Sequence, residues 1–285
     1  MSIIKQVKQR LLHYSWELAY GEYDESLLGT GTLLSNYHVI KNPYKNKWFA
    51  DPFIYKDTRE SIELFVEEFD YMVGRGRIGH LIISKKTQKI EKLSIILEKE
   101  THLSFPAIYR IGDAVYVHPE NSASGKSFMY RYNEELDKLI EPIEVLAEPV
   151  TDAVIEQKMG KFMMYATKLP NPNGKELFIY QSDTFWGPYV YKEKMLFDKA
   201  YARLAGAMFK TSKGEIFRPS QDCEGGDYGK AVLIMIDGEV RVFLTPPAKK
   251  YAGLHTFNCL GGLYVVDLKI YDFPLLYRIK TYLKG

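Results

Sequence analysis

The sequence predicts an all-β fold, a five-bladed β-propeller with four-stranded blades, from three observations. A unit of about 50 residues recurs along nearly the whole chain, and a period near 50 with several strands per unit is typical of propellers. Each copy has a short apolar strand, a glycine-containing turn and a second apolar strand that ends in a polar or charged residue. The 22 Tyr and 15 Phe residues also suit strands.

The five units follow one another along the chain, and their first two strands cover residues 50–67, 105–120, 152–165, 203–219 and 255–266. A second strand pair follows the first, as at 79–83 and 93–97, which gives four strands per blade. The last unit is too short for a whole blade, so segment 16–48 is predicted to complete it. Strands from both termini would then close the ring within one domain, residues 1–285. Residues 1–12 are predicted to form a short helix, because Ile3, Ile4, Val7 and Leu11 share a face at helical spacing.

Composition excludes several classes of function. The formal net charge of +2 argues against general binding to nucleic acid or a membrane surface. No run of about 18 apolar residues predicts a membrane span, and the N-terminal segment does not resemble a secretory signal. Cys223 and Cys259 have neither metal-site nor disulfide spacing, so both are expected to be free thiols in a cytoplasmic protein.

Charged residues recur at equivalent positions of the repeat. Asp51 and Asp152 both precede the apolar stretch of a first strand, where Arg203 and His255 stand in the fourth and fifth units. The second strands end at Glu67 and Glu120 and, in the fourth unit, shortly before Asp222. Either aspartate taken alone is better explained as a turn or strand-entry residue, but the shared phase of the charges predicts one functional cluster on the propeller axis.

Several short motifs together resemble a known family. The segments that carry the resemblance are 50–53, 64–67, 76–79, 102–106, 119–120, 186–188, 202–206, 218–223 and 228–229. In this order and spacing they look like the N-terminal five-bladed propeller domain of glucosamine inositolphosphorylceramide transferases and its stand-alone relatives. That domain is similar in fold to glycoside hydrolase family 43.

The resemblance implies three carboxylates of an inverting glycosidase: a base, an acid and a residue that tunes the acid. Asp51 matches the base and Asp152 the tuning carboxylate. The acid is expected at the start of the fourth blade, where residues 202–206 have none, so Glu67, Glu120 or Asp222 would have to serve, with Glu67 or Glu120 the first choice. Arg203 instead suggests an anionic group on the ligand, or an ion pair with Asp152 or Asp51.

Two functions from different classes remain. The first is a carbohydrate-active enzyme that cleaves or transfers a glycosyl unit with an anionic group on or next to the sugar. The second is a non-catalytic glycan- or nucleotide-sugar-binding module of a surface-polysaccharide pathway, and an interaction propeller is a third, plainer reading. No cofactor or metal is predicted, and the oligomeric state is left open. The substrate-binding candidates are Arg203, Asp222, His255, Gln221 and Trp186.

Overall fold

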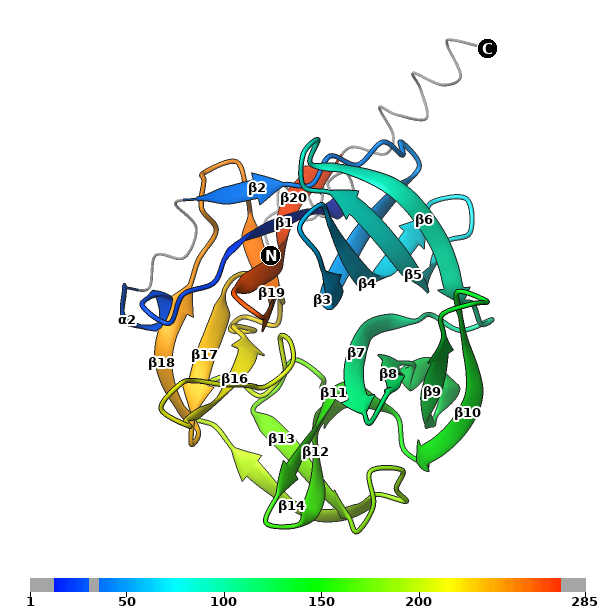
Figure 1. Cartoon of the computed structure of the whole chain (residues 1–285). Helices are drawn as coiled ribbons and strands as arrows, with labels where there is room; N and C mark the ends of the chain where they lie inside the picture. The colour runs from blue at the N-terminus through cyan, green and yellow to red at the C-terminus, as the bar shows by residue number, and fades with distance from the viewer. Residues whose placement is uncertain (1–12, 31–35, 273–285) are drawn as a thin grey trace, which may run out of the picture.

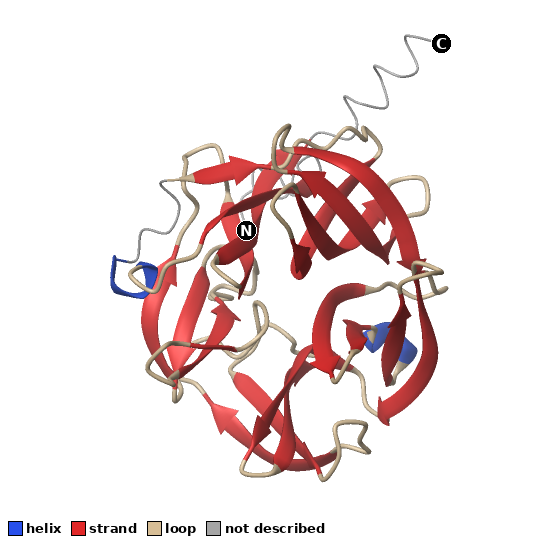
Figure 2. Ribbon diagram, in the orientation of Figure 1, coloured by secondary structure: helices blue, strands red, loops and turns tan. Residues whose placement is uncertain are grey.

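Five four-stranded antiparallel sheets surround one axis, as Figure 1 shows, in a computed structural model that describes residues 13–30 and 36–272. Strands are the main secondary structure of these residues and are joined by loops and turns (Figure 2). The exceptions with helical turns are α2 (Leu27–Thr30) and the 3₁₀ turn η1 (Ser122–Ser124). The predicted five-bladed propeller is therefore confirmed, whereas the helix predicted at 1–12 lies outside the described residues. No helix among the described residues is long and apolar enough to cross a membrane.

The first three blades each use four consecutive strands. Blade I contains β3 (Lys47–Asp57), β4 (Ser61–Asp70), β5 (Arg75–Ser84) and β6 (Lys89–Leu97). Blade II contains β7 (Ser104–Ile111), β8 (Ala114–Glu120), β9 (Ser127–Asn133) and β10 (Lys138–Leu146). Blade III contains β11 (Val150–Lys158), β12 (Lys161–Lys168), β13 (Glu176–Ser182) and β14 (Val190–Leu196). Burial falls from the axis to the rim: most of β11 is buried, whereas every residue of β14 is exposed.

The last two blades depart from this regular pattern. Blade IV contains β15 (Phe209–Lys210), β16 (Ile216–Gln221), β17 (Val232–Ile236) and β18 (Glu239–Leu244). Its innermost strand is only two residues long, and the segment before it completes the inner wall. Blade V combines β19 (Gly253–Leu260) and β20 (Leu263–Asp272) with β1 (His13–Glu22) and β2 (Tyr37–Val39).

Blade V closes the ring as predicted. β1 pairs with β20 along its whole length, from His13 opposite Asp272 to Glu22 opposite Leu263. Closure by pairing removes the open sheet edges that an incomplete ring would expose.

The apolar core lies between the blades. One cluster joins Leu18 and Tyr20 of β1 to Ile62 and Leu64 of β4. Another brings together residues of blades I to IV, among them Phe53, Phe105, Val154 and Leu233. Burying each of these large side chains contributes about 1.5–3 kcal/mol. Packing on both sheet faces therefore fixes the blades around the axis and holds the inner strands in place.

Candidate functional site

A β-bulge at the same place in four inner strands builds the site. The pairing register shifts after Ala50 in β3, Ser104 in β7, Thr151 in β11 and Leu254 in β19. The residues that enter these bulges are Asp51, Phe105, Asp152 and His255. Asp51, Phe105 and Asp152 have φ values of 49°, 43° and 51°, an uncommon conformation for residues other than glycine. Bulges re-aim side chains, and these inner strands face the centre of the ring in Figure 1.

Asp51, His255 and Asp267 form a buried network between blades I and V. The backbone N–H of Asp51 donates to Asp267 Oδ2 at 2.9 Å, and His255 Nδ1 lies 2.9 Å from the same oxygen. The backbone N–H and the hydroxyl of Thr256 both donate to Asp267 Oδ1 at 2.7 Å. Asp51 Oδ1 lies 3.4 Å from His255 Nδ1, and Asp51 Oδ2 accepts the N–H of Phe105. Asp267 thus connects two of the bulged strands.

The network shifts the pKa of each member. Burial raises the pKa of Asp51 well above its usual range, although the charge of His255 opposes the increase. Burial alone would lower the pKa of His255, but the charges of Asp267 and Asp51 raise it above its usual value. Burial disfavours the charged form of Asp267, yet His255 and the hydrogen bonds lower its pKa. The charge pair therefore lies between His255 and Asp267, and burial makes Asp51 a stronger proton acceptor than an exposed aspartate.

These three residues offer ligand atoms within 4.8 Å of one another, as a metal site would. The donor set argues otherwise, because both oxygens of Asp267 already accept hydrogen bonds from N–H and O–H groups pointed at them. A cation between Asp267 and His255 would meet the N–H proton of Nδ1. The arrangement fits a hydrogen-bonded ion pair better than a metal centre.

Arg203, in the segment that leads into blade IV, is paired with residues of blade III. Its Nε donates to Asp152 Oδ2 at 2.6 Å, its Nη1 donates to Asn173 Oδ1 at 2.7 Å, and its guanidinium lies 4.6 Å from the ring centre of Tyr228. Gln221 also donates to Asp152 Oδ2, at 3.3 Å. Of the alternatives for Arg203, the geometry shows the ion pair with Asp152. Its charge is therefore compensated before any ligand binds.

Two glutamates complete the polar wall. Glu67 Oε1 lies 3.1 Å from His102 Nε2, and His102 Nδ1 accepts the backbone N–H of Gly76. Glu120 accepts hydrogen bonds from the hydroxyl of Ser104 and the backbone N–H of Ser122, both at 2.9 Å. Burial raises the pKa of Glu120. For His102, burial lowers the pKa, but the contact with Glu67 and nearby carboxylates raises it overall.

Several of these side chains line one axial pocket of about 390 Å³. Polar groups and aromatic rings share its wall, which is typical of sites that bind a small polar ligand. Its lining consists of Trp16, Trp48, Asp51, Glu67, Phe69, His102, Ser104, Glu120, Ser122, Thr151, Leu169, Pro172, Arg203, Tyr228 and His255.

The structure brings together most, but not all, of the residues predicted for the site. Asp51, Glu67, Glu120, Arg203 and His255 line the pocket. The remaining four candidates, Asp152, Gln221, Asp222 and Trp186, are absent from the lining of this pocket as the described residues form it.

Each of the four has a place that explains this. Asp152 and Gln221 are buried behind Arg203, where they hold its guanidinium. Asp222 accepts the N–H of Glu224 in the turn after β16. Trp186 packs against Tyr116 of blade II, with 4.4 Å between the ring centres.

The sequence analysis missed several residues of the site. Asp267 lies one residue away from the strand-exit position that marks Glu67 and Glu120, so the repeat gave no signal for it. His102 lies between two blades, although it belongs to one of the motifs that carry the resemblance. Trp16 enters through the closing strand β1 and stacks on His255, with 4.5 Å between the ring centres.

Comparison with known proteins gives both a family and a fold. Residues 31–242 match the family model described as glucosamine inositolphosphorylceramide transferase 1, N-terminal. The chain is 26% identical over 198 residues to glucosamine inositolphosphorylceramide transferase 1 of Oryza sativa subsp. japonica, covering 67% of this chain and 26% of that protein. The corresponding protein of Arabidopsis thaliana is 28% identical over 200 residues, covering 66% and 25%. The chain spans about a quarter of the length of these curated relatives.

Solved structures agree with the fold. An α-L-arabinofuranosidase from Podospora anserina, in complex with cellotriose, superposes with a TM-score of 0.57 at 7% identity, over 81% of this chain and 93% of that one. A GH43_1 enzyme from Xanthomonas citri, in complex with xylotriose, gives a TM-score of 0.51 at 11% identity, over 76% and 80%. At these identities the likeness shows the propeller architecture alone.

Proposed function

The chain belongs to the family of the glucosamine inositolphosphorylceramide transferase 1 N-terminal domain, and we propose that its axial pocket binds a carbohydrate and cleaves or transfers a glycosyl unit. The observation that carries the proposal is the convergence of Asp51, Glu67 and Glu120 with aromatic rings in one pocket. Paired carboxylates are the usual catalysts of glycosidic bond cleavage, and aromatic rings offer flat apolar faces to a sugar ring. The family's name and the sugar-bound structural neighbours point to the same class of ligand.

The general base and the general acid are assigned from the surroundings of each carboxyl group. Asp51 Oδ1 has no hydrogen-bond partner among the described residues, so it is free to take a proton. Its raised pKa brings its proton affinity closer to neutral pH, where a general base works best. Glu120 is the proposed acid, because burial raises its pKa and keeps it protonated to higher pH. Glu67 is held by His102, so it is the weaker candidate for donating a proton.

In the proposed reaction, Asp51 removes a proton from a water molecule or an acceptor hydroxyl. The resulting oxygen forms a bond to the anomeric carbon as the bond to the leaving oxygen breaks. Glu120 donates its proton to that leaving oxygen. Each turnover therefore leaves Asp51 protonated and Glu120 ionised, and exchange with solvent restores both.

A second function, a non-catalytic glycan-binding module, is favoured by one specific observation. The fourth blade presents Arg203 where the resemblance implies the acid, and Arg203 ties up Asp152 in an ion pair. A binding protein needs the shape and polarity of the pocket but no proton donor.

The test compares Asp51→Asn and Glu120→Gln with wild type on a panel of aryl glycosides and nucleotide sugars. Asp51→Asn is expected to lower turnover by about two to four orders of magnitude, because an amide cannot accept the proton. Glu120→Gln is expected to lower the turnover of substrates with poor leaving groups more than that of substrates with good ones, because only the poor leaving groups need a proton from the acid.

The control is Asp222→Asn, which changes a carboxylate outside the pocket. Wild-type binding without turnover of any glycoside or nucleotide sugar supports the binding module. If the Asp51→Asn variant turns over substrate at the wild-type rate, the catalytic role proposed for Asp51 is wrong.

A further inference from the structure

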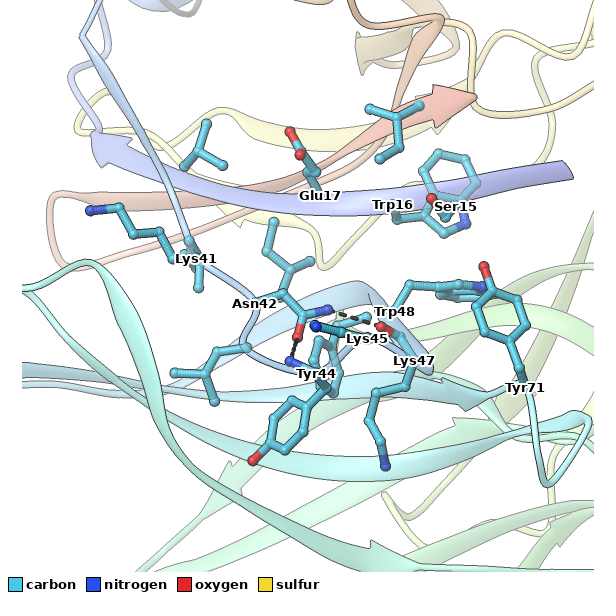
Figure 3. Close-up of a pocket in the computed structure, with 16 residues that line it drawn as sticks. Ser15, Trp16, Glu17, Lys41, Asn42, Tyr44, Lys45, Lys47, Trp48 and Tyr71 are labelled. Carbon is cyan, nitrogen blue, oxygen red and sulfur yellow. Dashed lines mark hydrogen bonds between the residues drawn. The ribbon is translucent and has the colours of Figure 1, made fainter. Parts of the chain in front are cut away.

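A second cavity, of about 430 Å³, lies between blades V and I beside the axial pocket. Figure 3 shows it between β1, which carries Ser15, Trp16 and Glu17, and the segment that leads into β3. Trp16 and Trp48 line both cavities. The two indoles therefore form a shared aromatic wall between the axial pocket and this inter-blade cleft.

The cleft carries uncompensated positive charge. Lys41, Lys45 and Lys47 line it, and Lys47 is neutralised by Glu68 and Asp70 at 2.7 and 3.0 Å. No carboxylate of a described residue pairs with Lys41 or Lys45, both of which are exposed. Lys41 has only a 3.5 Å contact to the carbonyl oxygen of Thr87.

The remaining acid of the cleft is already paired. Glu17 is the acidic residue among the side chains that line the cleft, and it lies 3.4 Å from Lys250. Two ammonium groups are thus left to act on a ligand. In Figure 3, Lys45 lies between Trp48 and the Lys41 end of the cleft.

This charge distribution differs from the axial pocket. The sequence analysis suggested that Arg203 binds an anionic group of the ligand, but the charge of Arg203 is compensated by Asp152, whose Oδ2 lies 2.6 Å from its Nε. His102 and His255, the other basic side chains that line that pocket, are paired with Glu67 and Asp267. Among the described residues, the cleft therefore offers unpaired ammonium groups to an anion, and the axial pocket does not.

We propose that the cleft binds an anionic group carried by the saccharide whose reacting unit occupies the axial pocket. The inference rests on the proposed function and deepens it, since it defines the ligand as at least two units long. The saccharide passes over Trp16 and Trp48, and its phosphate, sulfate or carboxylate reaches Lys45 and Lys41. An ammonium on a flexible stem acts as a point charge, so it accepts any of these three groups.

The test uses a glycan array of matched sets, each with a neutral oligosaccharide and the same backbone bearing a phosphate, a sulfate or a uronic acid. The strongest set is then titrated by calorimetry against wild type, Lys41→Gln, Lys45→Gln and Lys158→Gln. Lys158 is the control, an exposed lysine at the end of β11 in blade III, so its variant makes the same change of charge away from the cleft.

Wild type is expected to bind the anionic member more tightly than the neutral one. Lys45→Gln is expected to reduce that preference about tenfold, as loss of a charge-assisted contact does, with a smaller loss in Lys41→Gln and none in Lys158→Gln. The preference should also shrink with added salt, because exposed charges are screened. The array arms identify which of the three anions fits.

Two results overturn the inference in distinguishable ways. If saccharides bind but charge makes no difference, or Lys45→Gln weakens neutral and anionic members equally, the cleft proposal fails and the axial pocket stands. If no saccharide of either kind binds wild type, the proposed function fails, and the cleft proposal fails with it.

Discussion

Replacing Asp267 with asparagine probes the network that joins blades I and V. The carboxylate is fully buried and accepts hydrogen bonds from Asp51, His255 and Thr256, the last through two groups. An asparagine has nearly the same shape, but only its oxygen accepts, and its NH₂ group then faces donors. The substitution also leaves His255 without its main counter-charge.

The expected loss follows from these contacts. Hydrogen bonds to charged groups contribute about 1.5–3 kcal/mol each, and an amide oxygen keeps about two of the four. The Asp267→Asn variant is therefore expected to lose about 3–5 kcal/mol, the range found when a buried ion pair is broken. For a protein of this size that corresponds to a decrease of about 5–8 °C in Tm.

The pH dependence of this loss gives a second, independent measure. The pKa of Asp267 is lowered from 3.8, so its contribution is present above that value and is lost as the pH falls through the folded-state pKa. The pKa of His255 is raised from 6.5, so its contribution is present below that value and is lost as the pH rises through the folded-state pKa. Asp51 has a raised pKa, so its contribution decreases as the pH rises, which is opposite to the change for Asp267. The difference in Tm between wild type and variant is therefore the informative quantity.

Thermal unfolding followed by circular dichroism from pH 3 to pH 9 supplies the measurement. The difference in Tm between wild type and Asp267→Asn should be greatest between about pH 4 and pH 6.5 and smaller at both ends. Asp222→Asn, at a half-buried turn, is the matched control and should change Tm by at most about 2 °C. A difference that is equally small for both variants, or that is constant over the whole range, would refute the reasoning.

Three further outcomes are expected. Gly206→Ala brings its Cβ into a clash with the backbone oxygen of Phe257 in β19, so urea unfolding should show a loss above about 2 kcal/mol, against about 1 kcal/mol for Gly214→Ala in an open turn. Equal losses would contradict this. Glu67→Gln should lower the pKa of His102, measured by NMR titration, because Glu67 raises it now; an unchanged pKa would show that the contact does not form. Burial raises the pKa of Cys223 to about 12, so a thiol reagent at pH 8 should modify it only slowly until the protein is unfolded, and rapid native modification would be inconsistent with its burial.

The sequence predicted the ring because each blade repeats the same local pattern. Period, turn residues and strand length are local properties, so five units and an incomplete last blade could be recognised without knowing any contact. The positions of Asp51, Glu67, Glu120 and His255 followed from the same repeat, since equivalent residues of a propeller face the same axis.

The side-chain contacts between blades could not be predicted from the sequence. Whether Arg203 meets Asp152 or a ligand depends on the angle between blades III and IV, which no local pattern encodes. Asp267 was hidden because the bulge in β19 places it opposite the unpaired residues, one step from the position shared by Glu67 and Glu120. His102 and Trp16 enter from an inter-blade segment and from the closing strand, outside the repeat that guided the prediction.

The closing strand has a consequence for how the protein is made. β1 is synthesised before the other described strands and its partner β20 after them, with Trp16 opposite Lys269. At about 5–20 residues per second, roughly 250 residues of synthesis separate the two strands by some 10–50 s. During that time Trp16, Leu18 and Tyr20, all buried in the finished ring, lack β20, the strand that pairs with the whole length of β1. A circular permutant that places β1 directly after β20 would remove this delay. Comparing the yields of folded protein from the permutant and the wild-type chain in a cell-free translation system would show what fraction of the wild-type chain fails to fold because of the delay.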